Sequence, residues 1–345
     1  MELARNNHTI PQDYLRQWSM DGRCVFARRL LVPAPTYPEW EPKPISSLTV
    51  YRDLYTSVGR GEESDAIERW LNREFETPAA DALDRVFRDV ALEAEDHRVL
   101  VRYLAALDRR TPVAFAETME LLARITPDAL SRAHARLGGT LRQAKSVRRR
   151  LLRQQRASTE ASDIVPLPIR TAVDTDPETG DPVVKTVTTV GREAWLSALE
   201  RQLKTTAQHL LAHDWCILRP ANESEWFTSD HPVVRLNFTN SEQYDFRGGW
   251  GRRGTDIFLA LSPKHLLYCR IGYPKPREQT ASVEHTYLIQ RCIAERAHRW
   301  IFARSPQRRA EWFRERRVNK ALFVEEEAAW ADFHDSQVRE ELSAP

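Results

Sequence analysis

Cysteine is scarce in this sequence, with four in 345 residues, and no two of them form a C-x-x-C pair. A zinc ribbon or a small disulfide-framed secreted domain needs paired or dense cysteines, so both classes are excluded. We expect the four thiols to be reduced and partly buried. They are Cys24, Cys216, Cys269 and Cys292.

Long hydrophobic runs are also missing. No stretch approaches the roughly 18 apolar residues that a membrane-spanning helix requires. The first residues, M-E-L-A-R-N-N-H, lack the apolar segment of a secretory signal. The sequence therefore predicts a cytoplasmic protein with no membrane partner.

An excess of charge of one sign is absent as well. The chain has 51 Lys and Arg residues against 49 Asp and Glu residues, which leaves a formal net charge of +2. A basic field over the whole molecule is thereby excluded, and any binding of nucleic acid requires a local patch. With 41% hydrophobic and 29% charged residues, the composition is that of a globular protein.

The chain changes character near Ser158. Residues 1–158 are predicted to be mainly helical, because apolar residues recur at helical spacing after a proline-rich stretch at 33–44. Residues 159–345 combine β-branched strand segments with amphipathic helices and end in a charged helix. We predict an α+β fold, with an N-terminal helical bundle packed on a mostly antiparallel sheet with flanking helices. The two regions form two domains or one composite domain.

The helical region contains three threonine–proline pairs. Threonine can cap the free amides of a first turn, and proline fits the first helical position because its missing N–H costs nothing there. Each pair therefore predicts a helix entrance. The pairs are Thr77–Pro78, Thr111–Pro112 and Thr126–Pro127.

The N-terminal stretch N-N-H-T-I-P-Q-D-Y-L-R-Q-W places His8 just ahead of a helix that begins at Pro11. The positive end of the helix dipole disfavours a protonated imidazole, and a neutral one could act as a general base or a metal ligand. A histidine that only hydrogen-bonds the neighbouring loop is the simpler alternative. Asn7 and Tyr14 lie beside it as candidate substrate-binding residues.

A second stretch, W-F-T-S-D-H-P-V-V at 226–234, brings Ser229, Asp230 and His231 to the end of an apolar strand. Side chains alternate along a strand, so Ser229 and His231 share one face and Asp230 occupies the other. Asp230 is a candidate catalytic group and Ser229 a candidate substrate-binding group. The alternative is an aspartate that caps the following turn.

Two further motifs are short. In R-R-T-P, Arg110 at a helix entrance could clamp a phosphate or carboxylate, or lock an acidic residue within the bundle. In H-L-L-A-H, His209 and His213 have the i, i+4 spacing of zinc ligands, but the glutamate of H-E-x-x-H is missing. We therefore name no metal ligand and no cofactor.

Basic residues gather in local runs. Arg142 to Arg156 holds seven basic residues and no acidic one, and Arg149 and Arg150 are its candidate ligand-binding residues. The segment R-G-G-W-G-R-R adds Trp250, which could stack on a base. Such runs could track a phosphate backbone, or they could be solvated faces that pair with acidic segments of the same chain.

Taken together, N-H-T-I-P-Q-D-Y-L-R-Q-W, R-T-P and T-S-D-H-P-V resemble the domain-of-unknown-function family 4238. The family pattern is N-H-x-x-P-x-x-Y-L, then R-T-P, then S-D-x-P-V, and L-A-L-S-P-K-H resembles its later P-L-S-P segment, with Ala260 in place of proline. The resemblance implies no activity. It implies a set of signature positions, which are Asn7, His8, Pro11, Tyr14, Arg110, Ser229, Asp230 and Pro232.

Three functional hypotheses follow from these residues. The first is a hydrolase or transferase acting on an anionic, phosphodiester or nucleic-acid substrate, with His8 as base, Asp230 orienting it and Arg110 stabilising negative charge. The second is a non-enzymatic module that binds RNA or a protein through its basic runs. The third is a scaffold whose signature residues fix the junction between helices and sheet.

Overall fold

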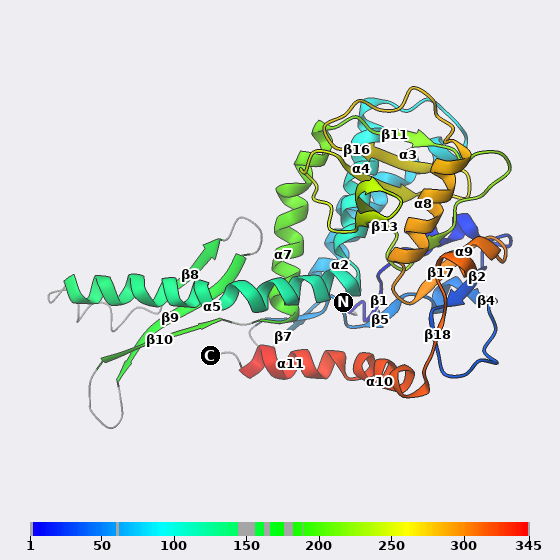
Figure 1. Cartoon of the computed structure of the whole chain (residues 1–345). Coiled ribbons are helices and arrows are strands. Elements are labelled where there is room, and N and C mark those ends of the chain that lie inside the picture. The colour runs from blue at the N-terminus through cyan, green and yellow to red at the C-terminus, as the bar shows by residue number, and fades with distance from the viewer. Residues whose placement is uncertain are drawn as a thin grey trace.

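The computed structural model describes residues 3–59, 62–143, 156–161, 166–175, 182–188 and 190–343. Its main body combines a five-stranded and a four-stranded antiparallel sheet with surrounding helices (Figure 1). A long helix and a three-stranded sheet project from this body on one side. The fold is α+β, as predicted.

The five-stranded sheet has the order β11-β16-β15-β13-β14, and every neighbouring pair is antiparallel. All six residues of its central strand β15 are buried, so this strand lies in the core. The strands are β11 (Cys216–Leu218), β13 (Val233–Asn240), β14 (Gln243–Asp245), β15 (Thr255–Ala260) and β16 (Leu266–Arg270).

The four-stranded sheet has the order β12-β17-β2-β4 and is also antiparallel throughout. Two of its strands come from the first half of the chain and two from the second half. Both regions of the sequence therefore contribute to one sheet. The strands are β2 (Cys24–Arg29), β4 (Glu41–Pro44), β12 (Thr228–Ser229) and β17 (Trp300–Ala303).

Smaller sheets complete the β-structure. Strands β9 and β10 pair antiparallel, and the residues between them lie outside the described part of the chain. The three-stranded sheet contains β8 (Arg156–Ala161), β9 (Pro166–Thr175) and β10 (Pro182–Thr188). The two-stranded pairs are β1 (Asn6–His8) with β5 (Val50–Arg52), β3 (Leu31–Val32) with β18 (Arg317–Val318), and β6 (Ser57–Gly59) with β7 (Glu62–Ser64).

The helices surround the sheets, and α2 to α5 with their connecting turn form most of residues 66–143. The α-helices are α1 (Gln12–Leu15), α2 (Ala66–Leu71), α3 (Thr77–Phe87), α4 (Ala94–Arg109), α5 (Pro112–Gln143), α7 (Arg192–Lys204), α8 (Val283–Arg296), α9 (Arg308–Phe313), α10 (Lys320–Ala331) and α11 (Phe333–Ser343). Short 3₁₀ turns span Arg16–Trp18, Ile45–Ser47 and Thr206–Ala212, and a π-helical turn spans Asn72–Glu76.

The threonine–proline pairs differ in outcome. At Thr111–Pro112 the prediction is confirmed, since α5 begins there and the Thr111 hydroxyl accepts an amide hydrogen bond from its first turn (3.2 Å). At Thr126–Pro127 it is wrong, because Pro127 lies inside α5. An internal proline costs a helix about 3 kcal/mol. Apolar packing against α7 on both sides of the proline, through Leu122 and Ala129, offsets that cost.

Helices α10 and α11 form a C-terminal arm that lies along one side of the body (Figure 1, red). Arg192 of α7 is fully buried and binds Glu341 of α11 through two contacts, Nε to Oε1 at 2.9 Å and Nη2 to Oε2 at 2.8 Å. The same guanidinium donates to the Asp53 carbonyl at 2.9 Å. One arginine thus joins α7, the N-terminal region and the C-terminal arm.

Candidate functional site

The segments that carry the motifs contact one another in the fold. Tyr14 makes some of these contacts. Its buried hydroxyl donates to the Ala260 carbonyl at 2.7 Å and accepts from the Thr228 hydroxyl at 2.6 Å. Trp18, one turn further, donates from its indole to the Trp226 carbonyl at 2.8 Å. Hydrogen bonds therefore connect the N-terminal helix to β12 and to the end of β15.

Arg110 joins the R-T-P motif to the same N-terminal segment. Its buried guanidinium donates to the His8 carbonyl at 2.5 Å and forms an ion pair with Glu76. The Tyr55 hydroxyl donates to the Arg110 carbonyl at 2.6 Å. Asn7 is occupied in a similar way, since its amide donates to the Ala4 carbonyl at 2.9 Å and accepts from the backbone of Tyr55 at 3.1 Å.

His8 is half-buried, with a partner for each ring nitrogen. Nδ1 lies 3.3 Å from the Leu48 carbonyl, and Nε2 lies 3.0 Å from the side-chain amide of Gln12. A carbonyl can only accept and the amide nitrogen can only donate, so these contacts fix the neutral tautomer with its proton on Nδ1. Burial lowers the pKa of His8, and the nearby Arg110 lowers it further. The imidazole is therefore neutral at pH 7.

Asp230 lies at the end of β12 with both carboxylate oxygens engaged. They accept the backbone N–H groups of His298 at 3.0 Å and Arg299 at 2.8 Å, in the turn between α8 and β17. Ser229 accepts from the backbone N–H of His231 at 3.2 Å. These contacts hold β12 beside β17.

No hydrogen bond or ion pair among the described residues joins the side chains of His8, Arg110 and Asp230 to one another. Arg110 reaches the backbone of His8, not its imidazole. The catalytic set of these three residues therefore stays a prediction. Their observed contacts connect elements of the fold.

A buried network of charges lies next to these motifs and involves their sequence neighbours. Asp108, just before the R-R-T-P motif, is fully buried and pairs with Arg109 at 2.9 Å and with Arg235 of β13 at 3.2 Å. Burial opposes ionisation of Asp108, but the two arginines outweigh it and hold the pKa of the carboxyl below its ordinary value. Arg235 also pairs with Glu117 of α5 at 3.2 Å, and Arg296 of α8 pairs with Glu117 at 2.6 Å.

His231, the residue after Asp230, belongs to this network. Its Nε2 lies 3.5 Å from Nη2 of Arg296, and its Nδ1 has no hydrogen-bond partner among the described residues. Burial lowers the pKa of His231 well below its ordinary value, and Arg296 lowers it further. The imidazole is neutral, and its Nδ1 is buried without a hydrogen-bond partner in the described chain.

A cavity of about 910 Å³ opens beside the network, and we call it the arginine cavity. Four arginines and three acidic residues line it. Arg235 and Arg296 have the partners described above, whereas Arg124 and Arg247 are exposed and form no ion pair with any described residue. The lining residues are Glu117, Glu120, Leu121, Arg124, Arg235, Asp245, Phe246, Arg247 and Arg296.

The basic runs of the sequence divide between this cavity and regions outside the described residues. Arg247 lines the cavity, but Trp250 is buried and donates its indole N–H to Asp108 at 2.9 Å. The guanidinium of Arg109 lies over the Trp250 ring at 5.5 Å. The interpretation of Trp250 as a stacking residue stays a prediction. The residues at 149 and 150 lie outside the described part of the chain.

Among the described residues, no group of three or more His, Cys, Asp or Glu side chains is placed to hold a metal ion. His209 lies in the 3₁₀ turn Thr206–Ala212 and His213 follows it, so the α-helical face that would align them at i, i+4 is not formed. In the same part of the chain, no helix is long and apolar enough to cross a membrane.

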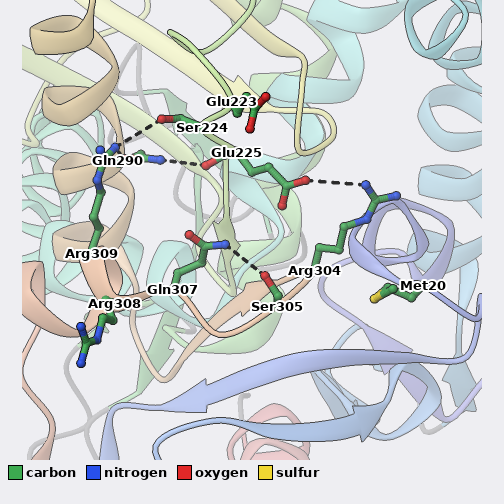
Figure 2. Close-up of a pocket in the computed structure, with 10 residues that line it drawn as sticks. All are labelled: Met20, Glu223, Ser224, Glu225, Gln290, Arg304, Ser305, Gln307, Arg308 and Arg309. Carbon is green, nitrogen blue, oxygen red and sulfur yellow. Dashed lines mark hydrogen bonds and ion pairs between the residues drawn. The ribbon is translucent and has the colours of Figure 1, made fainter.

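Figure 2 shows another cavity, of about 610 Å³, near the start of α9. Arg309 donates to the Gln290 amide oxygen at 3.0 Å, and Gln290 donates to the Glu225 carbonyl at 2.7 Å. Arg304 lies 3.6 Å from the Glu225 carboxylate. Glu223 and Arg308 form no ion pair with any described residue (Figure 2), so this cavity has one such exposed arginine, whereas the arginine cavity has two.

Sequence reasoning missed Asp108, Arg235 and Arg296 as members of a site. Asp108 ends the apolar run L-A-A-L, and Arg235 interrupts the apolar strand V-V-R-L. A charged residue within an apolar periodic segment is a signal of a buried ion pair, since an unpaired charge there would be costly. The pairing between these segments could not be read from their local sequence.

The protein has an α+β fold, and the segments that carry its motifs contact one another in that fold. Comparison with known families agrees with the motifs. A family model described as "Protein of unknown function (DUF4238)" matches residues 6–307. The chain belongs to this family, which confirms the resemblance seen in its motifs. No curated protein and no solved structure matches the chain.

Proposed function

We propose that the protein binds a phosphate-bearing ligand, a phosphodiester or a short nucleic acid, in the arginine cavity. The observation that carries this proposal is the pair of exposed arginines, Arg124 and Arg247, on the wall of one cavity without an ion-pair partner in the described chain. A guanidinium presents two parallel N–H groups that match two phosphate oxygens.

The buried network supports the same role by orienting the cavity wall. Glu117 forms ion pairs with both Arg235 and Arg296, and Asp108 forms a second ion pair with Arg235. These arginines need no reorganisation when an anion arrives, because their rotamers are already fixed by neighbours. The neutral His231 behind Arg296 adds no further positive charge that would require a counter-ion.

Catalysis of hydrolysis or group transfer at the bound phosphoester is the chemistry that we propose for this cavity. Positioned guanidinium groups stabilise the negative charge that develops on phosphoryl oxygens in the transition state. Glu120 lies on the same wall and forms no ion pair with any described residue, so its carboxylate could accept a proton from an attacking water. Binding without catalysis, as an RNA-binding module, is the second candidate, favoured by the exposed arginines of the 247–253 loop.

Calorimetric titration with a DNA dinucleotide and with pyrophosphate tests the binding site. We expect Arg124→Glu/Arg247→Glu to weaken binding at least about tenfold, because each substitution removes a charge-assisted hydrogen bond and adds a repulsive charge. Arg252→Glu in the same loop is the matched control, since Arg252 does not line the cavity. It should retain binding within about twofold.

Equal losses in the double variant and the control would contradict a site in this cavity. A chromogenic phosphodiester, bis(p-nitrophenyl) phosphate, then separates catalysis from binding. Release of nitrophenolate by the wild type and its loss in the double variant would support an enzyme. Binding without release would favour the RNA-binding module, whose affinity should fall steeply with salt concentration.

A further inference from the structure

A separate cavity of about 440 Å³ lies at the edge strand β11, and we call it the edge pocket. It is bounded by the end of α3, the segment before α4, β11 and the loop at 275–279. Apolar side chains line one part of it and basic side chains another. The larger apolar residues are Val86, Val90, Leu92, Trp215 and Ile217, and the polar or charged ones include Asp89, His97, Arg219, His265, Lys275 and Arg277.

Asp89 shows that this pocket is organised around a fixed carboxylate. Its φ of 56° lies in the left-handed region, at the end of α3 where glycine would be less strained. The Asp89 carboxylate accepts from His265 Nε2 at 2.9 Å and forms an ion pair with Arg219. The hydroxyl of Ser262 lies 2.8 Å from His265 Nδ1 and completes the chain of hydrogen bonds.

Because Asp89 is engaged by Arg219 and His265, the remaining cations on the wall lack an internal counter-ion. Lys275 and Arg277 are exposed and form no ion pair with any described residue. The Nδ1 of His97 is buried and has no hydrogen-bond partner among these residues. The pocket therefore combines an apolar wall with two exposed cations that form no ion pair with a described residue.

We propose that the edge pocket binds a small organic anion with an apolar body, such as an aromatic carboxylate or sulfonate. The anionic group would lie between Lys275 and Arg277. The apolar body would cover Val90, Leu92 and Ile217. This site is distinct from the arginine cavity in its lining residues, and it does not depend on the function proposed there.

The apolar wall separates this ligand class from that of the arginine cavity. Leu121 and Phe246 are the apolar side chains of the arginine cavity, whose wall otherwise consists of charged residues. Larger apolar side chains line the smaller edge pocket, which favours a ligand that loses apolar surface from water on binding. Inorganic phosphate, which has no such surface, should compete poorly.

The fluorescent probe 8-anilinonaphthalene-1-sulfonate, titrated into the full chain, tests the proposal. We expect one saturable site, with the dissociation constant raised at least about tenfold by Lys275→Glu/Arg277→Glu. The matched control is Arg124→Glu/Arg247→Glu, which makes the same charge change at the arginine cavity and should leave probe binding unchanged. Val90→Asp, at a position 47% exposed, should weaken binding by placing a carboxylate on the apolar wall.

Unchanged probe binding in Lys275→Glu/Arg277→Glu, or an equal loss in both double variants, would overturn the proposal. Absence of saturable binding by the wild type would overturn it too. Circular dichroism melting of each variant separates loss of the site from loss of the fold. Displacement of the probe by benzoate but not by inorganic phosphate would support the ligand class, and the reverse order would overturn it.

Discussion

Glu68 of α2 is a carboxylic acid placed where its charged form is poorly solvated. Its Oε2 is buried and has no hydrogen-bond partner in the described chain. Burial raises its pKa to about 7; Arg110 opposes this shift, and the neighbouring acids Glu76 and Asp65 add to it. The folded protein therefore holds a proton on Glu68 at pH values where the unfolded chain has released it.

We expect Glu68→Gln to stabilise the protein at pH 8 and to have little effect at pH 4, below the unfolded pKa of Glu68. The folded pKa of Glu68 lies above its unfolded value of about 4.3, so wild-type stability falls as the pH rises between the two. Glutamine removes this loss, with a gain on the order of 1 kcal/mol or more in the free energy of unfolding. Urea denaturation at both pH values measures it.

The exposed Glu62→Gln is the control for Glu68 and should show no such pH dependence. A Glu68→Gln variant that is less stable at pH 8 than the wild type would contradict the prediction. That result would mean that ionised Glu68 stabilises the fold through Arg110 despite its burial.

Local sequence singled out Asp230 and His231 but not the residues that they contact. Asp230 binds the 298–299 backbone and His231 lies beside Arg296. The pattern could not supply the partners, because Asp108 and Arg296 reach His231 from helices far away in the sequence. The identities of buried partners depend on tertiary packing, which no local spacing encodes.

At the scale of elements, Asp230 connects β12 to the turn that leads into β17. We expect Asp230→Asn to lower the free energy of unfolding by about 1–3 kcal/mol, and Asp230→Ala to lower it further. Asparagine keeps one acceptor oxygen for the two backbone N–H groups, whereas alanine keeps none. Chemical denaturation of both variants measures the order.

Asp245→Ala is a matched control for Asp230. Its carboxylate also accepts a backbone N–H, from Arg247 at 2.7 Å, but the residue is exposed. Water can replace its oxygen there, so the loss should be smaller. If Asp230→Ala were as stable as the wild type and lost ligand binding alone, Asp230 would belong to a site and not to the junction of strands.

The elements themselves were more predictable than their pairing. Helical periodicity identified the helices that became α3 and α4, and apolar segments with β-branched residues identified β13, β15 and β16. The sequence patterns did not identify β17 and β4 as the partners of β2. Local sequence fixes the period of an element, while the choice of a partner strand depends on contacts across the whole chain.

At the scale of the molecule, the ion pair between Arg192 and Glu341 fastens the C-terminal arm, which lies beyond the family match at 6–307. We expect Glu341→Gln to lower the free energy of unfolding by on the order of 3 kcal/mol, because it leaves a buried guanidinium without its counter-charge. Chemical denaturation followed by tryptophan fluorescence measures the loss.

Glu340→Gln, one residue earlier and exposed, is the control and should change stability by about 0.5 kcal/mol at most. Equal stability of the two variants would show that the arm is held by its apolar contacts, such as that of Trp330 with Tyr51 at 4.6 Å between ring centroids. The charge pair would then serve only to orient α11.

The strand order β12-β17-β2-β4 also has a consequence for the protein during its synthesis. β2 leaves the ribosome early, yet its partner β17 follows only when the chain has reached Ala303. Until then β2 presents an unpaired edge and buries little apolar surface, a situation that favours aggregation and slow folding. The nascent chain should therefore depend on chaperones for most of its translation, and the four-stranded sheet should form only near its end.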